Sequence, residues 1–365
     1  MSQAQRHFNK QLFPYYAAGA VLLLTICAVI FSFIITGKTR RGDETATSTP
    51  VVIESPSPTV TLVPRKLDGV LVLQGQENLQ PRAVMIDNMI DARPQSGIAD
   101  ANVVFEVPAE GGITRFIAIF DASSTVEKIG PVRSARPYFV DWAKSFNAAY
   151  FHVGGSPDAI EKLATMGKTI VNIDEIGRGQ YFWRDQSRYA PHNVYTNTDR
   201  MSQAVTALGT TGTTITSAWR FKETTSSTEP TIPGINIPFG GSYNVTWTYQ
   251  PDSSTYKRTL AKKPHVDADG DVVQASNVIV MKTDSQVLDA KGRLQLRTTG
   301  SGDAFVYRDG NRYTARWRRS PNEPLRLETL SGNDVELNRG ITWVEVVTDS
   351  VAFSGFMPAT TSTTP

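Results

Sequence analysis

An uncharged apolar run near the amino terminus constrains this chain more than any other sequence feature. No charged side chain occurs from Gln11 to Gly37, and residues 17–37 read AAGAVLLLTICAVIFSFIITG. A helix of about 20 apolar residues crosses the roughly 30 Å hydrocarbon core of a bilayer. No small-residue cleavage site appears before the KTRRGDE segment that follows. The sequence therefore predicts a short segment 1–14 and an uncleaved transmembrane anchor over residues 15–37.

The residues in and after this run predict its setting. The only cysteine, Cys27, lies inside the run, and Ile26 stands where a lipid-modified cysteine usually has a small residue. Lipid modification is therefore disfavoured. Residues 38–65 are rich in Thr, Ser and Pro, a composition typical of an extended spacer. Such spacers commonly hold a domain away from a membrane, so we predict a single-pass protein of the cell membrane whose later domains are extracytoplasmic.

The first unit beyond the linker, residues 66–210, has the pattern of an α/β (α+β) domain. Short apolar runs typical of strands alternate with turns and helical segments. Ser156 and Pro157 are favourable residues at a helix start, and Gly167 is favourable at a helix end, so a helix is predicted between them. The apolar runs occupy residues 83–86, 102–107, 114–120 and 148–153.

The second unit, residues 237–356, is predicted to be mostly β. Apolar and polar residues alternate in YNVTWTYQ, and further short strand-like runs with Gly-containing turns follow. Residues 211–236 have little apolar periodicity and form the predicted connection between the two units. The tail 357–365 resembles the linker in composition and is predicted to be disordered.

Charge and motif content exclude several classes of protein. The 37 basic and 35 acidic residues give a net charge of +2, so nucleic acid is not an expected partner. The histidines have no metal-ligand spacing, and Ser156 has no G-x-S-x-G setting, so we expect no metal, no cofactor and no serine hydrolase. The DADGDVV stretch at residues 267–273 has its glycine at the fourth position, which favours a hairpin turn over a calcium loop.

Two closely spaced arginines predict an anion site. Arg133 and Arg136 stand at the turn into a predicted helix, and guanidinium groups bind carboxylate or phosphate through a rigid fork of donors. Polar residues also follow the predicted strands, which is where ligands gather in α/β sheets. The loop YFWRDQSRYAPHNVYT adds arginine, histidine and asparagine. The candidate anion ligands are Arg93, Arg115, Arg133, Arg136, Arg184, Arg188, His152, His192 and Asn193, and the candidate carboxylates of the site are Asp87, Asp100, Glu106 and Glu110.

A set of longer motifs resembles a known family. AVMIDN, ARPQSGIADANVVFEV, EGGITRFIAIF, KIGPVRSARPYF, FHVGGSPDAIEKL and RYAPHNVYT are similar to the amino-terminal domain of the YerB family of bacterial proteins named as lipoproteins. NVTWTY, YKR, NVIV and GITWVEVV are similar to that family's carboxy-terminal domain. The resemblance covers residues 67–347. It implies a two-domain architecture and a cell-envelope location, but no reaction, because the family has no known function. The chain departs from the family in lacking a convincing lipobox.

The order of strands, arginines and the GGSPDAIEKL segment is also similar to that of the LytR-CpsA-Psr phosphotransferases. This similarity implies that Arg93, Arg133 and Arg136 hold phosphate and that Asp87 or Asp100 binds a divalent metal such as Mg²⁺. Three hypotheses follow for an envelope protein: binding of an anionic wall or lipid-linked glycan, phosphotransfer onto such a glycan, or a non-catalytic structural role with other envelope proteins. Binding is better supported than catalysis, and neither a reaction nor the oligomeric state follows from the sequence.

Overall fold

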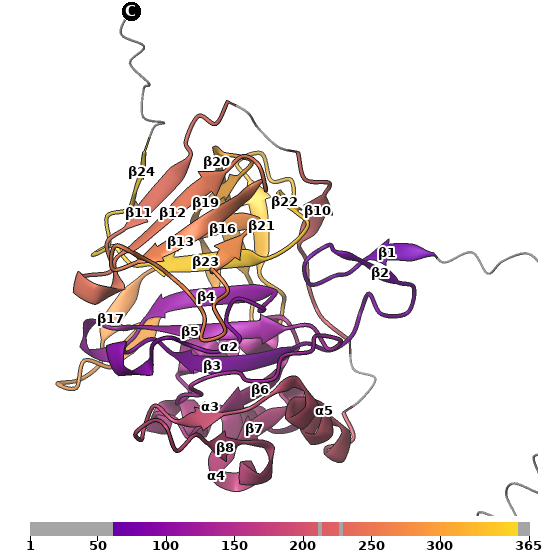
Figure 1. Ribbon diagram of the computed structural model, residues 1–365, viewed down its shortest axis with the longest axis vertical. Coiled ribbons are helices and arrows are strands. Elements are labelled where there is room, and N and C mark those ends of the chain that lie inside the picture. Colours follow the sequence, from indigo (N-terminus) through magenta and orange to yellow (C-terminus); the bar gives the residue numbers. More distant parts are fainter. Residues whose placement is uncertain (1–60, 211–213, 226–228, 357–365) are drawn as a thin grey trace, which may run out of the picture. The chain divides into compact units, whose positions relative to one another are not determined.

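One ten-stranded β-sheet runs through both halves of the described chain, which in this computed structural model comprises residues 61–210, 214–225 and 229–356 (Figure 1). Strands from the first half form one side of the sheet, and strands from the second half form the other. In sheet order the strands are β21 (Arg326–Thr329), β20 (Asn311–Arg319), β19 (Gly300–Arg308), β16 (Asn277–Lys282), β23 (Thr342–Val347), β4 (Val103–Pro108), β5 (Thr114–Phe120), β3 (Arg82–Asp87), β6 (Ala149–His152) and β7 (Asn172–Asp174).

The two halves of the chain meet at the pairing of β23 with β4. These strands run parallel, with Thr342 opposite Val103 and Glu345 opposite Glu106. The first half is mixed α/β and the second is mostly β, which confirms the predicted fold classes of the two parts. The predicted units therefore share one sheet and are joined through their backbones.

The predicted membrane anchor and tail lie outside the described residues. These segments are residues 15–37 and 357–365, together with nearly all of the linker 38–65. Within the described ranges, no helix combines the length and the apolar character needed to cross a bilayer. The anchor and its orientation stay predictions.

Helices α2 and α3 cover one face of the sheet in the first half, whereas α5 packs through Met201, Ala204 and Val205 in the core on the other face. Ala83 and Met85 of β3 pack with α2 and α3 residues such as Trp142 and Leu163 in one hydrophobic core. The helix predicted after Ser156 is confirmed, because α3 begins with Pro157 and Gly167 follows its last residue with a φ of 49°. The helices are α2 (Pro137–Ser145), α3 (Pro157–Met166), α4 (Glu175–Arg178) and α5 (Thr198–Ala207).

A second sheet covers the other face. Val84 and Ile86 of β3 belong to the core on this face, together with Trp247 and Tyr256 of the second sheet. This sheet has the order β14 (Lys263–Pro264), β13 (Thr255–Leu260), β12 (Val245–Gln250), β11 (Gly234–Ile237) and β24 (Ser354–Phe356), with β15 (Gln274–Ala275) paired to β13. The alternation predicted for YNVTWTYQ is confirmed in β12, where every second side chain is buried.

Short strand pairs and single turns complete the described fold. The strand pairs are β1 (Leu62–Pro64) with β2 (Leu71–Leu73), β8 (Trp183–Arg184) with β9 (Val194–Tyr195), β10 (Arg220–Lys222) with β22 (Glu336–Asn338), and β17 (Ser285–Val287) with β18 (Leu294–Leu296). The 3-10 turns are η1 (Ile90–Ala92), η2 (Glu110–Gly112), η3 (Gly167–Thr169), η4 (Gly179–Tyr181) and η5 (Gly241–Tyr243). The hairpin turn predicted at residues 267–273 is confirmed by a bridge between Val266 and Val272.

Candidate functional site

The end of strand β3 directs two neighbouring polar residues to opposite faces of the large sheet. Successive side chains of a strand point to opposite faces. Asp87 follows Met85 on the helical face, whereas Asn88 follows Ile86 toward the second sheet. Both side chains are fully buried. Each belongs to a different cluster of charged residues.

On the helical face, Asp87 holds an arginine and a histidine through one oxygen. Its Oδ2 atom lies 2.9 Å from Nε of Arg133 and 2.7 Å from Nδ1 of His192. The other oxygen accepts a hydrogen bond from the backbone N–H of Met89. Since a carboxylate only accepts, Nδ1 of His192 carries the proton and donates it. The buried aspartate therefore fixes the orientation of both side chains.

Arg133 and His192 keep unused hydrogen-bonding atoms. No described residue accepts a hydrogen bond from the terminal nitrogens of Arg133, and none bonds to Nε2 of His192. The side chain of Arg133 is 20% exposed and that of His192 is 11% exposed. Both groups therefore reach solvent. Asp87 holds His192 by a hydrogen bond at Nδ1 and Arg133 by an ion pair at Nε, which does not have the geometry of a hydrogen bond. This is the arrangement that a binding site for an anion requires.

Beside this pair, two further arginines share the carboxylate of Glu110. Arg136 donates to both oxygens of Glu110, from Nε at 3.0 Å and from a terminal nitrogen at shorter range. The fully buried Arg115 lies 3.5 Å from the same carboxylate and donates to the carbonyl of Ser134. Burial alone would raise the pKa of Glu110, but the bonds from Arg136 and the charge of Arg115 outweigh it and lower the pKa to about 2.

The two groups lie next to each other because of the strand register. Arg115 in β5 stands opposite Asp87 in β3. Arg136 is the residue immediately before helix α2, and Arg133 precedes it by three positions. Three guanidinium groups thus face two carboxylates, and His192 adds a further positive charge when it is protonated. The guanidinium groups therefore outnumber the carboxylates by one, and an excess of positive groups favours an anionic ligand. We call these six residues the Arg133 cluster.

The opposite face of the sheet holds a buried network around Arg258 of strand β13. Arg258 donates to Glu106 of β4 and, at 2.7 Å, to Nδ1 of His265. Its Nε atom lies 3.8 Å from Glu345 of β23, and its guanidinium stands 4.8 Å from the ring centre of Trp343. All of these side chains are within a few per cent of complete burial. The network ties strands of both halves and both sheets together.

Burial determines the protonation of this network. Burial, followed by the neighbouring charges of Arg258 and Arg93, holds the pKa of His265 well below its usual value, so the ring is neutral. Burial, with the charge of Glu106, raises the pKa of Glu345 well above its usual value. The network therefore contains one charged pair, Arg258 with Glu106, beside a neutral histidine and a neutral Glu345.

Amide and hydroxyl side chains add further bonds to the buried network, in which Nε of Arg258 and one oxygen of Glu345 have no hydrogen-bond partner among the described residues. Asn88 donates to Glu106 and to Thr114, and Thr114 donates to Glu106 at 2.5 Å. Gln95 donates to the carbonyl of Asp87 and accepts from His265. The network therefore reaches the backbone of the residue that anchors the Arg133 cluster.

The structure gives the other predicted ligands different places. Arg93 donates to Asn88 and to the carbonyl of Ser242, so its donors serve the contact between the two halves. His152 is buried, and its two ring nitrogens bond to the carbonyl of Gly154 and to Asn172. Both residues therefore hold the fold together. Neither has a contact with the Arg133 cluster among the bonds of the described residues.

The loop that carries His192 also holds the remaining predicted ligands. Arg184 bonds to Asn193 and to Glu175, and Arg188 donates to the carbonyl of Pro94. These bonds fix the loop against α4 and against the segment after β3. The bonds therefore help to position His192. The hydrogen bonds of Arg184 and Arg188 go to other groups of the protein.

Asp100 lies apart from the Arg133 cluster. Its carboxylate groups with those of Asp267 and Asp269, with the ligand atoms within 4.8 Å of one another. Burial and the neighbouring acids raise the pKa of Asp267 to about 6. Two backbone N–H groups, of Ala99 and Ala268, satisfy the Asp267 carboxylate. The group is an acidic turn beside the predicted hairpin.

Arg258, His265 and Glu345 were not among the predicted site residues. The sequence did contain a signal for Arg258, which stands between Tyr256 and Leu260 in a strand of alternating burial. A charged residue on the apolar face of a strand indicates an internal partner, because an isolated buried charge is very costly. No comparable local signal identified Glu345 or His265.

Comparison with known proteins identifies the family. Residues 67–211 match the family described as "Protein of unknown function (DUF3048) N-terminal domain", and residues 235–344 match its C-terminal domain. The chain belongs to this family. A relative in Bacillus subtilis (strain 168), named "Putative lipoprotein YerB", is 29% identical over 337 residues, which cover 91% of this chain and 97% of the relative. The predicted resemblance to the YerB family is confirmed.

A solved structure from the same family has the same fold. The crystal structure of the YerB protein from Bacillus subtilis superposes with a TM-score of 0.69 at 28% sequence identity. The match covers 79% of this chain and 98% of that protein. Nearly the whole of the solved relative is therefore represented in this chain.

Proposed function

We propose that this protein is a membrane-associated extracytoplasmic protein of the cell envelope that binds an anionic group of a wall glycan or of a lipid-linked glycan at the Arg133 cluster. The Bacillus subtilis relative is named as a lipoprotein, which supports attachment to the outer surface of a membrane. The predicted anchor and spacer of this chain support the same location.

The observation that carries the proposal is that Asp87 orients the side chains of both Arg133 and His192. Arg133 has its terminal nitrogens free of described partners, and His192 has Nε2 free in the same way. A phosphate or carboxylate that approaches the pair meets donors that are already held in place. Charge-assisted bonds to such preoriented donors are shorter and stronger than neutral ones.

The arrangement of the Arg133 cluster gives less support to phosphotransfer and to a non-catalytic structural role. A phosphotransferase would need a free carboxylate for a metal, but Asp87 already binds Arg133, His192 and the backbone of Met89. Asp100 lies with Asp267 and Asp269 in a group of carboxylates that could hold a metal ion, but no bond or ion pair among the described residues joins this group to the Arg133 cluster. A purely structural role would leave the exposed donors of the cluster without a purpose. We therefore propose binding and no reaction.

Titration calorimetry on the full-length chain tests the proposal. The probes are inorganic pyrophosphate, a soluble wall fragment that carries phosphodiester groups, and a neutral chitin tetrasaccharide. We expect the two anionic probes to bind, with affinity that falls as salt is added, and the neutral probe to bind much more weakly. Comparable affinity for all three probes would contradict the proposal. A higher affinity for pyrophosphate than for the wall fragment would favour the lipid-linked glycan as the natural source of the anion.

His192→Gln provides a second arm of the same experiment. Glutamine can still bond to Asp87, but it cannot carry a positive charge. We expect this variant to bind pyrophosphate more weakly than the wild type does. An unchanged affinity for pyrophosphate would show that His192 does not contact the anion.

A further inference from the structure

The short hairpin of β1 and β2 has an uncovered apolar face. Leu62 stands opposite Leu73, and Pro64 stands opposite Leu71. Opposite residues of an antiparallel pair lie on the same face, and so does every second residue along a strand. The three leucines on this face are 44–52% exposed, and Pro64 is also exposed. One side of the hairpin is therefore a continuous apolar surface in contact with solvent.

Exposed apolar side chains are concentrated in this hairpin. Thirteen large apolar residues are exposed among the described residues, and four of them fall within residues 62–73. These four are Leu62, Val70, Leu71 and Leu73. Single exposed apolar residues are ordinary, whereas a group of them on one face marks a surface that contacts a protein or a membrane. The hairpin face is therefore a candidate contact surface.

The connection between the two strands fixes the hairpin on the large sheet. Arg65 is paired with Asp68 at 2.6 Å and with Asp121, the residue after the end of β5, at 3.0 Å. Asp68 also accepts a hydrogen bond from Asn102, which precedes β4, and Leu67 belongs to the core on the helical face. Figure 1 shows the two strands projecting from the body beyond this connection. The apolar face is therefore held in a defined place.

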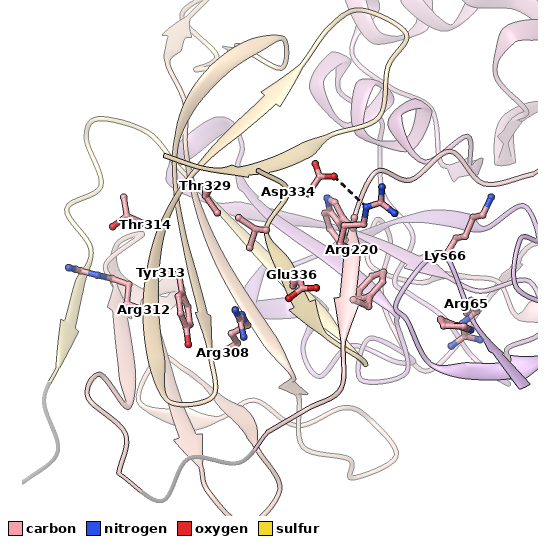
Figure 2. A pocket seen from close by; sticks show the side chains of 14 residues that line it. Arg65, Lys66, Arg220, Arg308, Arg312, Tyr313, Thr314, Thr329, Asp334 and Glu336 are labelled. Carbon is pink, nitrogen blue, oxygen red and sulfur yellow. Dashed lines mark hydrogen bonds and ion pairs between the residues drawn. The ribbon is translucent and has the colours of Figure 1, made fainter. Parts of the chain in front are cut away.

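The exposed charge of this segment is basic. Within residues 61–76, Lys66 is the one exposed charged side chain, whereas Asp68 is buried. Figure 2 shows Lys66 next to Arg65 on the connection between the strands. An apolar face in a segment with an exposed lysine and no exposed acid suits a surface of anionic lipid headgroups.

The position of the hairpin in the chain indicates what covers its apolar face. Residues 15–37 are predicted to cross the membrane, so only residues 38–61 separate the bilayer from β1. A coil of that length has a root-mean-square span of about 27 Å, and linkage over such a span gives a local concentration in the millimolar range. A second copy is a weaker candidate. Four side chains of about 100 Å² each amount to far less than the ~800 Å² that each partner buries in a stable interface.

We infer that the apolar face of the β1–β2 hairpin lies on the lipid surface and orients the folded part of the chain on the membrane. The inference rests on the membrane association in the proposed function, but not on the Arg133 cluster. The hairpin is paired through Arg65 to Asp121 at one end of β5, whereas Arg115 of the cluster stands near the other end. A seven-residue strand at about 3.3 Å per residue places these ends roughly 20 Å apart.

Fluorescence quenching in vesicles tests the inference on the full-length chain. Leu73→Cys and Val287→Cys, each on a Cys27→Ala background, carry an environment-sensitive fluorophore. Val287 is the control, because it is 62% exposed on β17 of another two-stranded sheet. The vesicles contain phosphatidylglycerol, phosphatidylcholine and a phospholipid with a nitroxide in the upper part of its acyl chain. We expect severalfold stronger quenching at position 73 than at position 287.

A double variant removes the apolar contact and keeps the label. With the fluorophore on Leu71→Cys, the substitutions Leu62→Gln and Leu73→Gln should reduce quenching severalfold. Leu330→Gln, which changes an apolar residue exposed elsewhere, should leave the quenching unchanged. Because all of these side chains are exposed, the fold should survive the changes. The affinity of the double variant for pyrophosphate should equal that of wild type, since the Arg133 cluster is separate.

Equal quenching at positions 73 and 287 of vesicle-bound protein would overturn the inference and leave the membrane location standing. Excimer emission from pyrene at position 73, without quenching by the lipid nitroxide, would also overturn it, because the face would then be covered by a second copy. Protein that does not float with the vesicles would contradict both the inference and the membrane location.

Discussion

The two faces of the large sheet use arginine in opposite ways. On one face, Arg258 is fully buried and directs its guanidinium to Glu106, His265 and Glu345. On the other face, Arg133 is held by Asp87 through Nε and leaves its terminal nitrogens at the surface. An arginine whose donors are taken up by the protein contributes to folding. One that is anchored by a single atom has donors left for a ligand.

The contrast between Arg258 and Arg133 predicts that Arg258→Met has the largest effect on stability. Removal of one partner from a buried pair leaves an uncompensated charge, which typically costs about 3–5 kcal/mol of the free energy of unfolding. Here the abandoned charge is that of Glu106. Denaturant unfolding of the purified chain measures the loss. The double variant Arg258→Met, Glu106→Gln should recover part of it, because both charges are then absent. A loss below about 1 kcal/mol in the single variant would contradict the claim that Arg258, unlike Arg133, contributes to folding.

A smaller loss is predicted for Glu110→Gln in the Arg133 cluster. Hydrogen bonds to charged groups contribute about 1.5–3 kcal/mol, and Arg136 would lose its charged partner. The folded-state pKa of Glu110, about 2, lies below the ordinary value of 4.5. Its contribution is therefore complete above about pH 4.5 and decreases as the pH falls toward 2.

Stability curves of wild type and Glu110→Gln should accordingly converge at low pH. Unfolding measured from pH 7 down to pH 2 checks this, with Glu127→Gln as the control for loss of an exposed glutamate that has no ion pair among the described residues. A difference that persists unchanged at pH 2 would show that the ion pair with Arg136 is not its cause.

Local sequence patterns were sufficient for much of the fold. The apolar runs at 83–86, 102–107 and 114–120 became strands β3, β4 and β5, and the capping residues around α3 predicted its ends. The pairing of β23 with β4 was not predictable in the same way. Strand pairing between distant segments depends on tertiary packing, which periodicity within a short window does not encode.

The sequence predicted which residues form the site better than it predicted how these residues contact one another. Asp87, Arg133 and His192 were all candidates: Asp87 because it follows a strand, Arg133 because of its spacing to Arg136, and His192 because of the composition of its loop. The sequence did not distinguish Arg133 from Arg136. That distinction depends on Glu110, which lies in the turn η2 before two glycines with φ near 73°. The reach of a side chain from such a turn follows from the folded backbone and is not visible in the sequence.

The smallest predicted change, and the most direct test of the central claim, is Arg133→Lys. Lysine can still pair with Asp87 but loses the planar fork of donors. Titration calorimetry with pyrophosphate and thermal unfolding of the same samples would compare wild type, Arg133→Lys and the control Arg318→Lys, whose side chain is 64% exposed. We predict that Arg133→Lys weakens binding about tenfold, or about 1.4 kcal/mol, with the melting temperature unchanged. A lower melting temperature with unaltered affinity would contradict the account and make Arg133 a structural residue like Arg258.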